Sequence, residues 1–297
     1  MTLDGRPLAE RLQETTCTPS ARTCLRLIMR RFDLPEIGDL PACPDWLRSA
    51  MTGFLRVMID RLRLYDDAAP VIASALTRST CDRIVDLCSG AGGPWPRLAS
   101  TLETTDASAL ITLTDLAPNQ SAAERVRTQP GITYRRAPVS ALEIPPDLPG
   151  MRTMFTALHH FDRDQVRRIL LDAQRDRVPF AAFEATGRSL RGLLCVLAVP
   201  FLVLWLMPRV ESVHPLALLL TYFPPVLPLM IGWDGIASSL RSHTEEELRG
   251  LCEEIAEPGY GWTVRRHALP RLPVQVLELV GQPERAPREP EREGSLP

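Results

Sequence analysis

The sequence predicts an α/β domain with a mostly parallel sheet, because short apolar runs alternate with helical stretches through the centre of the chain. A glycine-rich turn follows the first apolar run, and an aspartate ends the second. The chain has 297 residues, 45% apolar and 24% charged, and this ordinary globular composition excludes global disorder, collagen and coiled coil. At roughly 150 residues per domain, one large domain with an insertion fits as well as two domains.

The charge and cysteine content exclude several function classes. A net charge of −2 gives no general attraction for nucleic acid, so no nucleic-acid partner is expected. All 34 basic residues are arginine, which excludes a Schiff-base lysine and a P-loop lysine. The 7 cysteines include no Cys-x-x-Cys pair, and the first residues lack the apolar core of a secretory signal. We therefore expect free thiols in a reducing cytosol.

Residues 1–80 are expected to form a helical N-terminal cap. Apolar residues at three- and four-residue steps predict an amphipathic helix over Trp46–Leu64. The prolines and glycine of 33–44 mark a loop before it, and a second helix is expected over Ala68–Thr77.

The sheet domain is expected over 81–281. Five short apolar runs predict strands, and a helix is expected over Arg163–Arg175. Two further runs, joined by a proline-rich turn, predict a hairpin at the sheet edge. The seven predicted strands are 83–88, 110–114, 132–134, 151–156, 178–183, 262–267 and 274–280. Residues 282–297, rich in Pro, Glu and Arg, are expected to form a disordered tail.

The turn after the first strand carries the strongest functional signal. Gly90, Gly92 and Gly93 lack the Cβ atoms that would keep a ligand away from the backbone. Asp86 lies in the strand itself, where a carboxylate needs a partner. Asp115 ends the second strand, 22 residues after Gly93, a spacing suited to accepting hydrogen bonds from vicinal ribose hydroxyls. The alternatives are a purely structural turn and an aspartate that caps the next helix.

The run from Asp86 to Gly93, DLCSGAGG, resembles motif I of the class I S-adenosylmethionine-dependent methyltransferases. The resemblance implies a Rossmann-like methyltransferase fold, with S-adenosyl-L-methionine as cofactor and Asp115 at its ribose. The last glycine is displaced by one position, and Ser140 stands where the family often has an acid near the adenine. The cofactor contacts that the resemblance implies are Asp86, Leu87, Cys88, Ser89, Gly90, Gly92, Gly93, Asp115, Leu116, Ser140, Ala141 and Thr156.

The run Leu158-His159-His160-Phe161 after the fourth strand resembles the branch of this family that methylates quinones and related small molecules. A neutral imidazole there would serve as a general base, so His159 and His160 are the predicted catalytic residues. A hydrogen-bonded structural histidine is the alternative. Adjacent histidines are expected to point to different faces, so no metal site is predicted.

An apolar insertion, expected over 189–240, separates the fifth strand from the hairpin. It contains uncharged runs at 192–208 and 212–233, which fit either a membrane hairpin or a soluble lid. Prolines interrupt both runs, and both ends must return to the same sheet, so a single span is excluded. Possible membrane contact is assigned to 192–233, with the protein on the cytoplasmic side.

The insertion follows the edge where parallel sheets bind ligands, so we expect a hydrophobic or lipid-like acceptor. Glu184, Tyr222 and Asp234 are the predicted acceptor contacts, with a structural ion pair as the alternative for Glu184. The predicted function is methyl transfer to this acceptor. The alternatives are a membrane-associated scaffold that binds the cofactor without catalysis and a nicotinamide oxidoreductase, which the glycine spacing fits poorly.

Overall fold

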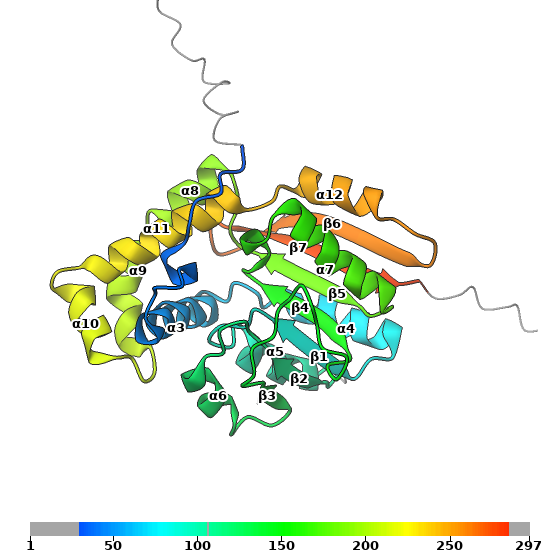
Figure 1. Cartoon of the computed structure of the whole chain (residues 1–297), viewed down its shortest axis with the longest axis horizontal. Coiled ribbons are helices and arrows are strands. Elements are labelled where there is room, and N and C mark those ends of the chain that lie inside the picture. Colours follow the sequence, from blue (N-terminus) through cyan, green and yellow to red (C-terminus); the bar gives the residue numbers. More distant parts are fainter. Residues whose placement is uncertain (1–29, 106, 285–297) are drawn as a thin grey trace, which may run out of the picture.

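The computed structural model describes residues 30–105 and 107–284, and its centre is a seven-stranded sheet (Figure 1). The strand order is β3-β2-β1-β4-β5-β7-β6. Strands β1 to β5 are parallel, β7 runs antiparallel to β5, and β6 runs antiparallel to β7. The strands are β1 (Arg83–Leu87), β2 (Leu110–Leu113), β3 (Ile132–Tyr134), β4 (Met151–Phe155), β5 (Phe180–Glu184), β6 (Tyr260–Ala268) and β7 (Gln275–Pro283). The predicted fold class, including the antiparallel hairpin at the edge, is confirmed.

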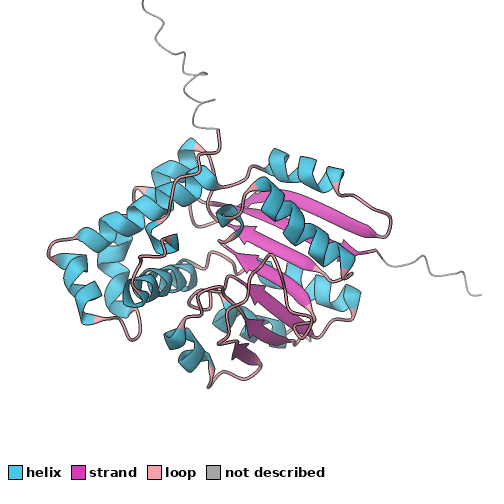
Figure 2. Cartoon of the chain, in the orientation of Figure 1, coloured by secondary structure: helices cyan, strands magenta, loops and turns pink. Residues whose placement is uncertain are grey.

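Helices cover both faces of the sheet, as Figures 1 and 2 show. One apolar core lies under α4 (Ala68–Ser79), α5 (Trp95–Glu103) and α6 (Gln120–Val126). A second core lies under α7 (Arg163–Arg175) and α12 (Glu245–Glu254). A capping box of Thr244 and Glu247 begins α12. Burial of the parallel strands on both faces explains their continuous apolar character.

The strand order places a ligand-binding crevice at one position. Chain connections leave β1 toward β2 on one side and continue from β4 on the other, so the order reverses between β1 and β4. In open parallel sheets ligands bind at the carboxyl ends of the strands beside such a reversal. The glycine-rich turn follows β1 and the histidine pair follows β4, so both lie at this position.

All regular secondary structure in the insertion after β5 is helical. It comprises α8 (Leu190–Val196), α9 (Val199–Leu206), η3 (Met207–Arg209), α10 (Pro215–Tyr222) and α11 (Val226–Arg241). A third apolar core joins these helices to α3 (Asp45–Leu62), around Phe54, Val203 and Leu227. In Figure 1 the insertion and α3 form a lobe beside the sheet. Asp234, one of the predicted acceptor contacts, lies inside α11.

The insertion contains a segment with the length and composition of a membrane span. Among the described residues, one helical run, Leu190–Arg209, passes this test. The pair α10 and α11 passes it only when taken together, and these two helices are bent by 86°.

Other predicted boundaries shift by one to a few residues. The expected helix over Trp46–Leu64 begins at Asp45 and ends at Leu62, and β6 begins at Tyr260. The tail expected over 282–297 starts too early, because Gln282 and Pro283 still belong to β7 and pair with β6. The expected helices before residue 30 and the part of the tail after 284 lie outside the described residues. Cys43, Cys81, Cys88, Cys195 and Cys252 are free thiols, as expected for this part of the chain.

Because α3 packs closely on the insertion, replacing a glycine of α3 by alanine is expected to destabilise the protein, although the same change stabilises most helices. A Cβ at Gly53 would lie 2.7 Å from the Cγ1 atom of Val210. Alanine normally stabilises a helix by about 1 kcal/mol relative to glycine. We expect Gly53→Ala to lower the free energy of unfolding by about 1–3 kcal/mol instead, because this position is already tightly packed.

Chemical denaturation measures this change, and Gly250→Ala in α12 is the matched control. Nothing lies within 4 Å of a Cβ at Gly250, so the control is expected to stabilise the protein. Stabilisation by both substitutions would contradict the close packing of α3 on the insertion.

Candidate cofactor and acceptor site

The glycine-rich turn holds its backbone in the left-handed region. Gly90, Gly92 and Gly93 have φ values of +50°, +95° and +47°, and Cys88 between strand and glycines has +57°. Glycine adopts these values without steric cost. A Cβ at Gly93 would meet no atom within 4 Å, so the backbone there is open to an approaching ligand.

Asp86 holds the turn from inside the strand. Its Oδ2 accepts a hydrogen bond from Ser89 Oγ at 2.6 Å, and its Oδ1 accepts one from Thr153 Oγ1 at 2.7 Å. Burial raises the pKa of this carboxyl to about 6. The side chain therefore ties β1 to β4 and to its own following turn, and its position favours a structural role beneath the ligand.

Asp115 joins the turns that follow β1 and β2. Its Oδ2 accepts from the backbone N–H of Gly90 at 2.7 Å, and its Oδ1 accepts from that of Ala117 at 2.8 Å. Each carboxylate oxygen has a second lone pair, so both oxygens keep acceptor capacity. Its half-buried side chain lies where the resemblance places the ribose contact.

Three polar side chains that the sequence pattern did not reveal brace the turn. Tyr134 at the end of β3 donates from its hydroxyl to the carbonyl of Gly90 at 2.8 Å. Arg125 donates to the carbonyl of Ala91. Thr52 on α3 accepts from Asn119 Nδ2 at 3.2 Å, and its methyl carbon lies 3.5 Å from the Cβ position of Gly90. Helix α3 therefore lies directly over the turn.

The other predicted cofactor contacts differ in accessibility. Leu87 and Ala141 are buried, so only their backbone can serve a ligand, whereas Leu116 is 68% exposed beside Asp115. Ser140 Oγ accepts from the backbone N–H of Leu142 at 3.2 Å. Thr156 has a φ of +50°, and its hydroxyl bonds to the hydroxyl of Tyr65.

A histidine pair lies on the short turn η2 (Leu158–His160) after β4. The two rings lie side by side, with centroids 4.3 Å apart and planes inclined by 33°. The expectation that they point to different faces is therefore wrong. Side chains alternate by 180° along a strand, whereas consecutive residues of a 3-10 turn are only about 120° apart, and this smaller angle lets the two rings meet.

Carboxylates surround His159. Its Nδ1 lies 2.9 Å from Glu184 Oε2, and its Nε2 lies 3.5 Å from Glu36 Oε1. Burial alone would lower the pKa of this imidazole, but the negative charges and hydrogen bonds of Glu184 and Glu36 raise it to about 10. With the proton retained at neutral pH, His159 in this environment is a poor general base.

His160 is more accessible, with a side chain 30% exposed. Its Nδ1 lies 2.8 Å from Asp39 Oδ2 on η1 (Ile37–Asp39). Arg241 at the end of α11 donates to the carbonyl of His160 at 3.0 Å and lies 3.1 Å from Asp39. Burial would raise the pKa of Asp39, but His160 and Arg241 lower it to about 2, so Asp39 is ionised.

The three predicted acceptor contacts have different surroundings. Glu184 is buried at the end of β5, accepts from the backbone N–H groups of Ala157 and Leu158, and lies 2.9 Å from His159 Nδ1, so the ion-pair alternative describes its environment. Asp234 accepts from the N–H groups of Ile37 and Gly38 at 2.7 and 3.0 Å. Tyr222 donates to the carbonyl of Leu204 within the insertion. Only Glu184 lies among the side chains of the carboxyl edge.

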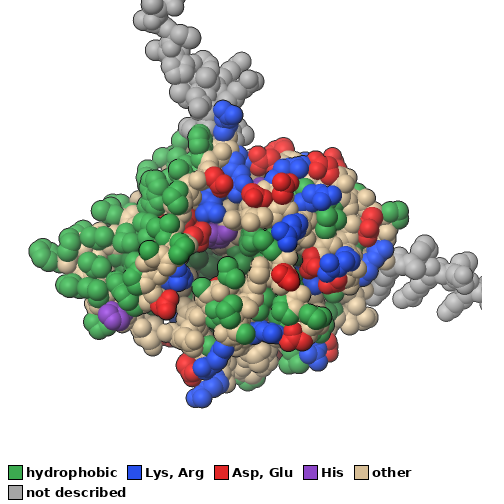
Figure 3. Space-filling view, in the orientation of Figure 1, with side chains coloured by type: hydrophobic (Ala, Val, Ile, Leu, Met, Phe, Trp, Pro, Cys, Tyr) green, Lys and Arg blue, Asp and Glu red, His purple; other side chains and the backbone are tan. Residues whose placement is uncertain are grey.

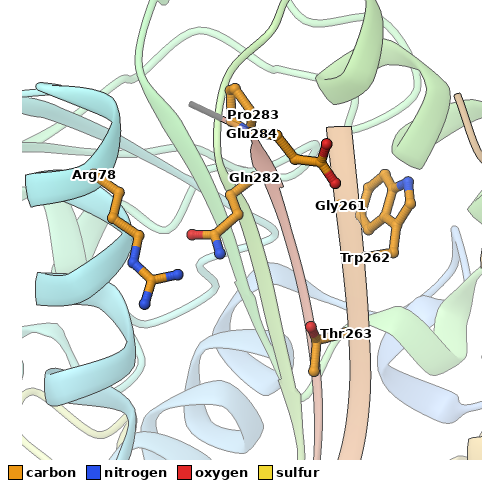
Figure 4. Close-up of a pocket in the computed structure, with 7 residues that line it drawn as sticks. All are labelled: Arg78, Gly261, Trp262, Thr263, Gln282, Pro283 and Glu284. Carbon is orange, nitrogen blue, oxygen red and sulfur yellow. The ribbon is translucent and has the colours of Figure 1, made fainter. Parts of the chain in front are cut away.

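A hollow lies between the insertion and the sheet in the space-filling view (Figure 3), with a histidine and charged side chains at its rim. A separate cavity of about 430 Å³ lies at the opposite edge of the sheet (Figure 4). Its lining includes Arg78, Trp262 and Gln282, and Gly281 beside it pairs with Phe180 at the start of β5. That cavity therefore has no access to the glycine-rich turn.

Comparisons with known proteins find similar solved structures only at low sequence identity. No protein-family model and no curated protein matches the chain. Similar solved structures include a candidate O-methyltransferase from Nostoc punctiforme PCC 73102, at 16% identity and TM-score 0.44, covering 87% of this chain and 66% of that one. Human N-acetylserotonin methyltransferase in complex with S-adenosylmethionine matches at 13% identity and TM-score 0.46, with 88% and 66% covered. Mitomycin 7-O-methyltransferase matches at 19% identity and TM-score 0.39, with 78% and 53% covered.

The chain thus spans about half to two thirds of the length of these proteins. At such identities the likeness concerns the fold alone. The sheet order and strand directions of this chain, rather than these matches, carry the assignment of an α/β fold with a mostly parallel sheet.

Proposed function

We propose that this protein transfers a methyl group from S-adenosyl-L-methionine to a small hydrophobic or lipid-like acceptor. The observation that carries the proposal is the hydrogen bond from the Gly90 N–H to Asp115, which fixes an open glycine turn beside a carboxylate at the sheet's reversal point. A nucleoside ligand needs both features, namely a backbone without side chains and an acceptor for two hydroxyls.

The residues present fit this cofactor. Gly93 leaves open space beside the turn, Asp115 keeps free lone pairs, and exposed Leu116 offers an apolar surface next to the carboxylate. When bound, the cofactor supplies a methyl group already activated on a sulfonium. The chain's own task is to align an acceptor atom with that methyl group and keep water out.

The acceptor side lies at the ends of β4 and β5. We assign the predicted base role to His160 rather than His159, because the side chain of His160 is 30% exposed whereas that of His159 is buried. Glu184 then positions the turn that carries both histidines, through the N–H groups of Ala157 and Leu158.

Cofactor binding is tested by calorimetric titration of the purified protein with S-adenosylmethionine and with S-adenosylhomocysteine. Asp115→Ala is expected to weaken binding by at least about tenfold, since it removes a charged hydrogen-bond acceptor worth about 1.5–3 kcal/mol. Asp147→Ala is the matched control, because Asp147 is an exposed aspartate paired with Arg135 and is not a predicted cofactor contact.

Binding by the wild type and the control, with loss in Asp115→Ala, supports the proposal. A folded wild-type protein that binds neither ligand would contradict it, and tight binding of a nicotinamide dinucleotide would favour the oxidoreductase alternative. Binding without methyl transfer to any hydrophobic acceptor would favour the non-catalytic scaffold.

The acceptor class is inferred from the surface of the insertion. Twelve of the sixteen exposed large apolar side chains in the described residues belong to it, and the green area on the left of Figure 3 lies over its helices. They are Leu190, Leu194, Leu197, Phe201, Trp205, Leu216, Leu219, Tyr222, Phe223, Val226, Leu229 and Trp233. A patch of this kind marks a protein or membrane contact.

We infer that the patch lies on the cytoplasmic surface of a membrane and does not span it. The opposite side of these helices is buried against α3, through residues such as Val203, Leu206 and Ile231. If these helices spanned the membrane, their contacts with α3 in that core would be lost. Helix α11 runs from Val226 beside the patch to Arg241 beside the histidine turn, so it connects the proposed membrane surface with the acceptor side.

The double variant Phe201→Glu/Phe223→Glu is expected to reduce binding to phosphatidylcholine–phosphatidylglycerol vesicles by at least roughly 100-fold, because each buried phenylalanine contributes about 1.5–3 kcal/mol. Both side chains are more than 70% exposed, at 72% and 79%, so the fold should tolerate the change. Vesicle co-sedimentation measures the loss. Leu110→Glu, 56% exposed on β2, is the control and should bind like the wild type. Equal binding by all three proteins would contradict membrane contact through the insertion.

A further inference from the structure

Two imidazoles and a carboxylate converge between the histidine turn and η1. Glu36 Oε1 lies 3.5 Å from His159 Nε2, and Glu36 Oε2 lies 4.0 Å from His160 Nε2. One ligand atom from each of the three residues lies within 4.8 Å of the others. Neighbouring ligand atoms of a tetrahedral ion with bonds of 2.0–2.1 Å are about 3.4 Å apart. Small side-chain movements would therefore bring the three ligand atoms to bonding distance from one ion.

We propose that Glu36, His159 and His160 bind one divalent transition-metal ion, for which Zn²⁺ is the best match. Two imidazole nitrogens and one carboxylate oxygen form a donor set that zinc binds well, while Mg²⁺ and Ca²⁺ require oxygen ligands. Three protein ligands leave one tetrahedral position for water or an acceptor atom.

The orientation of the rings supports this site. The far nitrogen of each ring, Nδ1, faces a carboxylate, at 2.9 Å from Glu184 for His159 and 2.8 Å from Asp39 for His160. Both Nε2 atoms are thereby turned toward Glu36. Metal-binding histidines in proteins are oriented by carboxylates in this way, which fixes the tautomer and strengthens the ligand.

The local charge also favours a divalent cation. Glu36, Asp39 and Glu184 bring three negative charges to the two rings, and Arg241, 3.4 Å from Glu36 and 3.1 Å from Asp39, brings one positive charge. Arg31 and Asp33 beside them pair with each other at 3.7 Å and cancel. Metal binding displaces the proton that His159 otherwise holds, because a ligand imidazole must be neutral. With both imidazoles neutral, the cluster carries an excess charge of about −2, which one divalent ion balances.

The metal site goes beyond methyl transfer and does not depend on it. The cluster lies at the carboxyl ends of β4 and β5, so an ion there would face the proposed acceptor side. In the metal-bound form neither Nε2 is free to accept a proton, so metal binding and the base role assigned to His160 exclude each other. Direct titration with metal distinguishes them.

The full chain, without an affinity tag and freed of metal by a chelator, is titrated calorimetrically with Zn²⁺, and metal retained after gel filtration is counted by elemental analysis. We expect one equivalent of Zn²⁺, and no binding of Mg²⁺ or Ca²⁺ at the same concentrations. His160→Ala and Glu36→Gln should each weaken binding by more than about 100-fold. Asp39→Asn, which alters only the orientation of His160, should cost about 10–100-fold.

His267→Ala on β6, remote from the cluster in sequence and strand order, is the matched control and should bind like the wild type. Circular dichroism checks that each variant is folded. No binding by the folded wild type, or equal binding by His160→Ala, would overturn the site; equal binding would place the ion on thiols instead. None of these measurements uses S-adenosylmethionine, so a failure to bind metal would not contradict the proposed methyl transfer.

Discussion

A buried carboxylate at the end of a strand must find hydrogen-bond donors, and this requirement shapes the whole carboxyl edge of the sheet. Asp86 binds the hydroxyls of Ser89 and Thr153, and Asp115 binds the Gly90 and Ala117 N–H groups. Glu184 binds two N–H groups of the histidine turn. Each carboxylate draws the loop of one strand onto its neighbour. The edge is therefore organised before any ligand arrives.

The same edge receives two elements from outside the sheet. Helix α3 places Thr52 over the glycine turn, and α11 brings Arg241 to the histidine turn. Helix α11 belongs to the insertion, and α3 shares one apolar core with the insertion. The packed lobe of α3 and the insertion therefore connects the exposed apolar surface with the candidate site, and this connection supports the proposed hydrophobic acceptor.

Local sequence patterns predict those structural elements whose signals come from residues close together in the chain. The strand–glycine turn, the aspartate after β2 and the helix over Arg163–Arg175 were predicted because their signals lie within a few positions of one another. Glu36, Tyr65 and Tyr134 were missed because their partners lie far along the chain, at His159, Thr156 and Gly90. The convergence of the histidines depends on a short turn where the sequence pattern suggested only a strand end.

Hydrogen–deuterium exchange with and without S-adenosylhomocysteine tests the central claim most directly, because it shows where the ligand binds. We expect slower exchange at 88–93 and 115–117, where the open glycine turn meets Asp115. Exchange at 261–263 and 282–284, beside the remote cavity, should not change. Protection confined to that cavity, or no protection at saturating ligand, would contradict a cofactor site at the carboxyl edge.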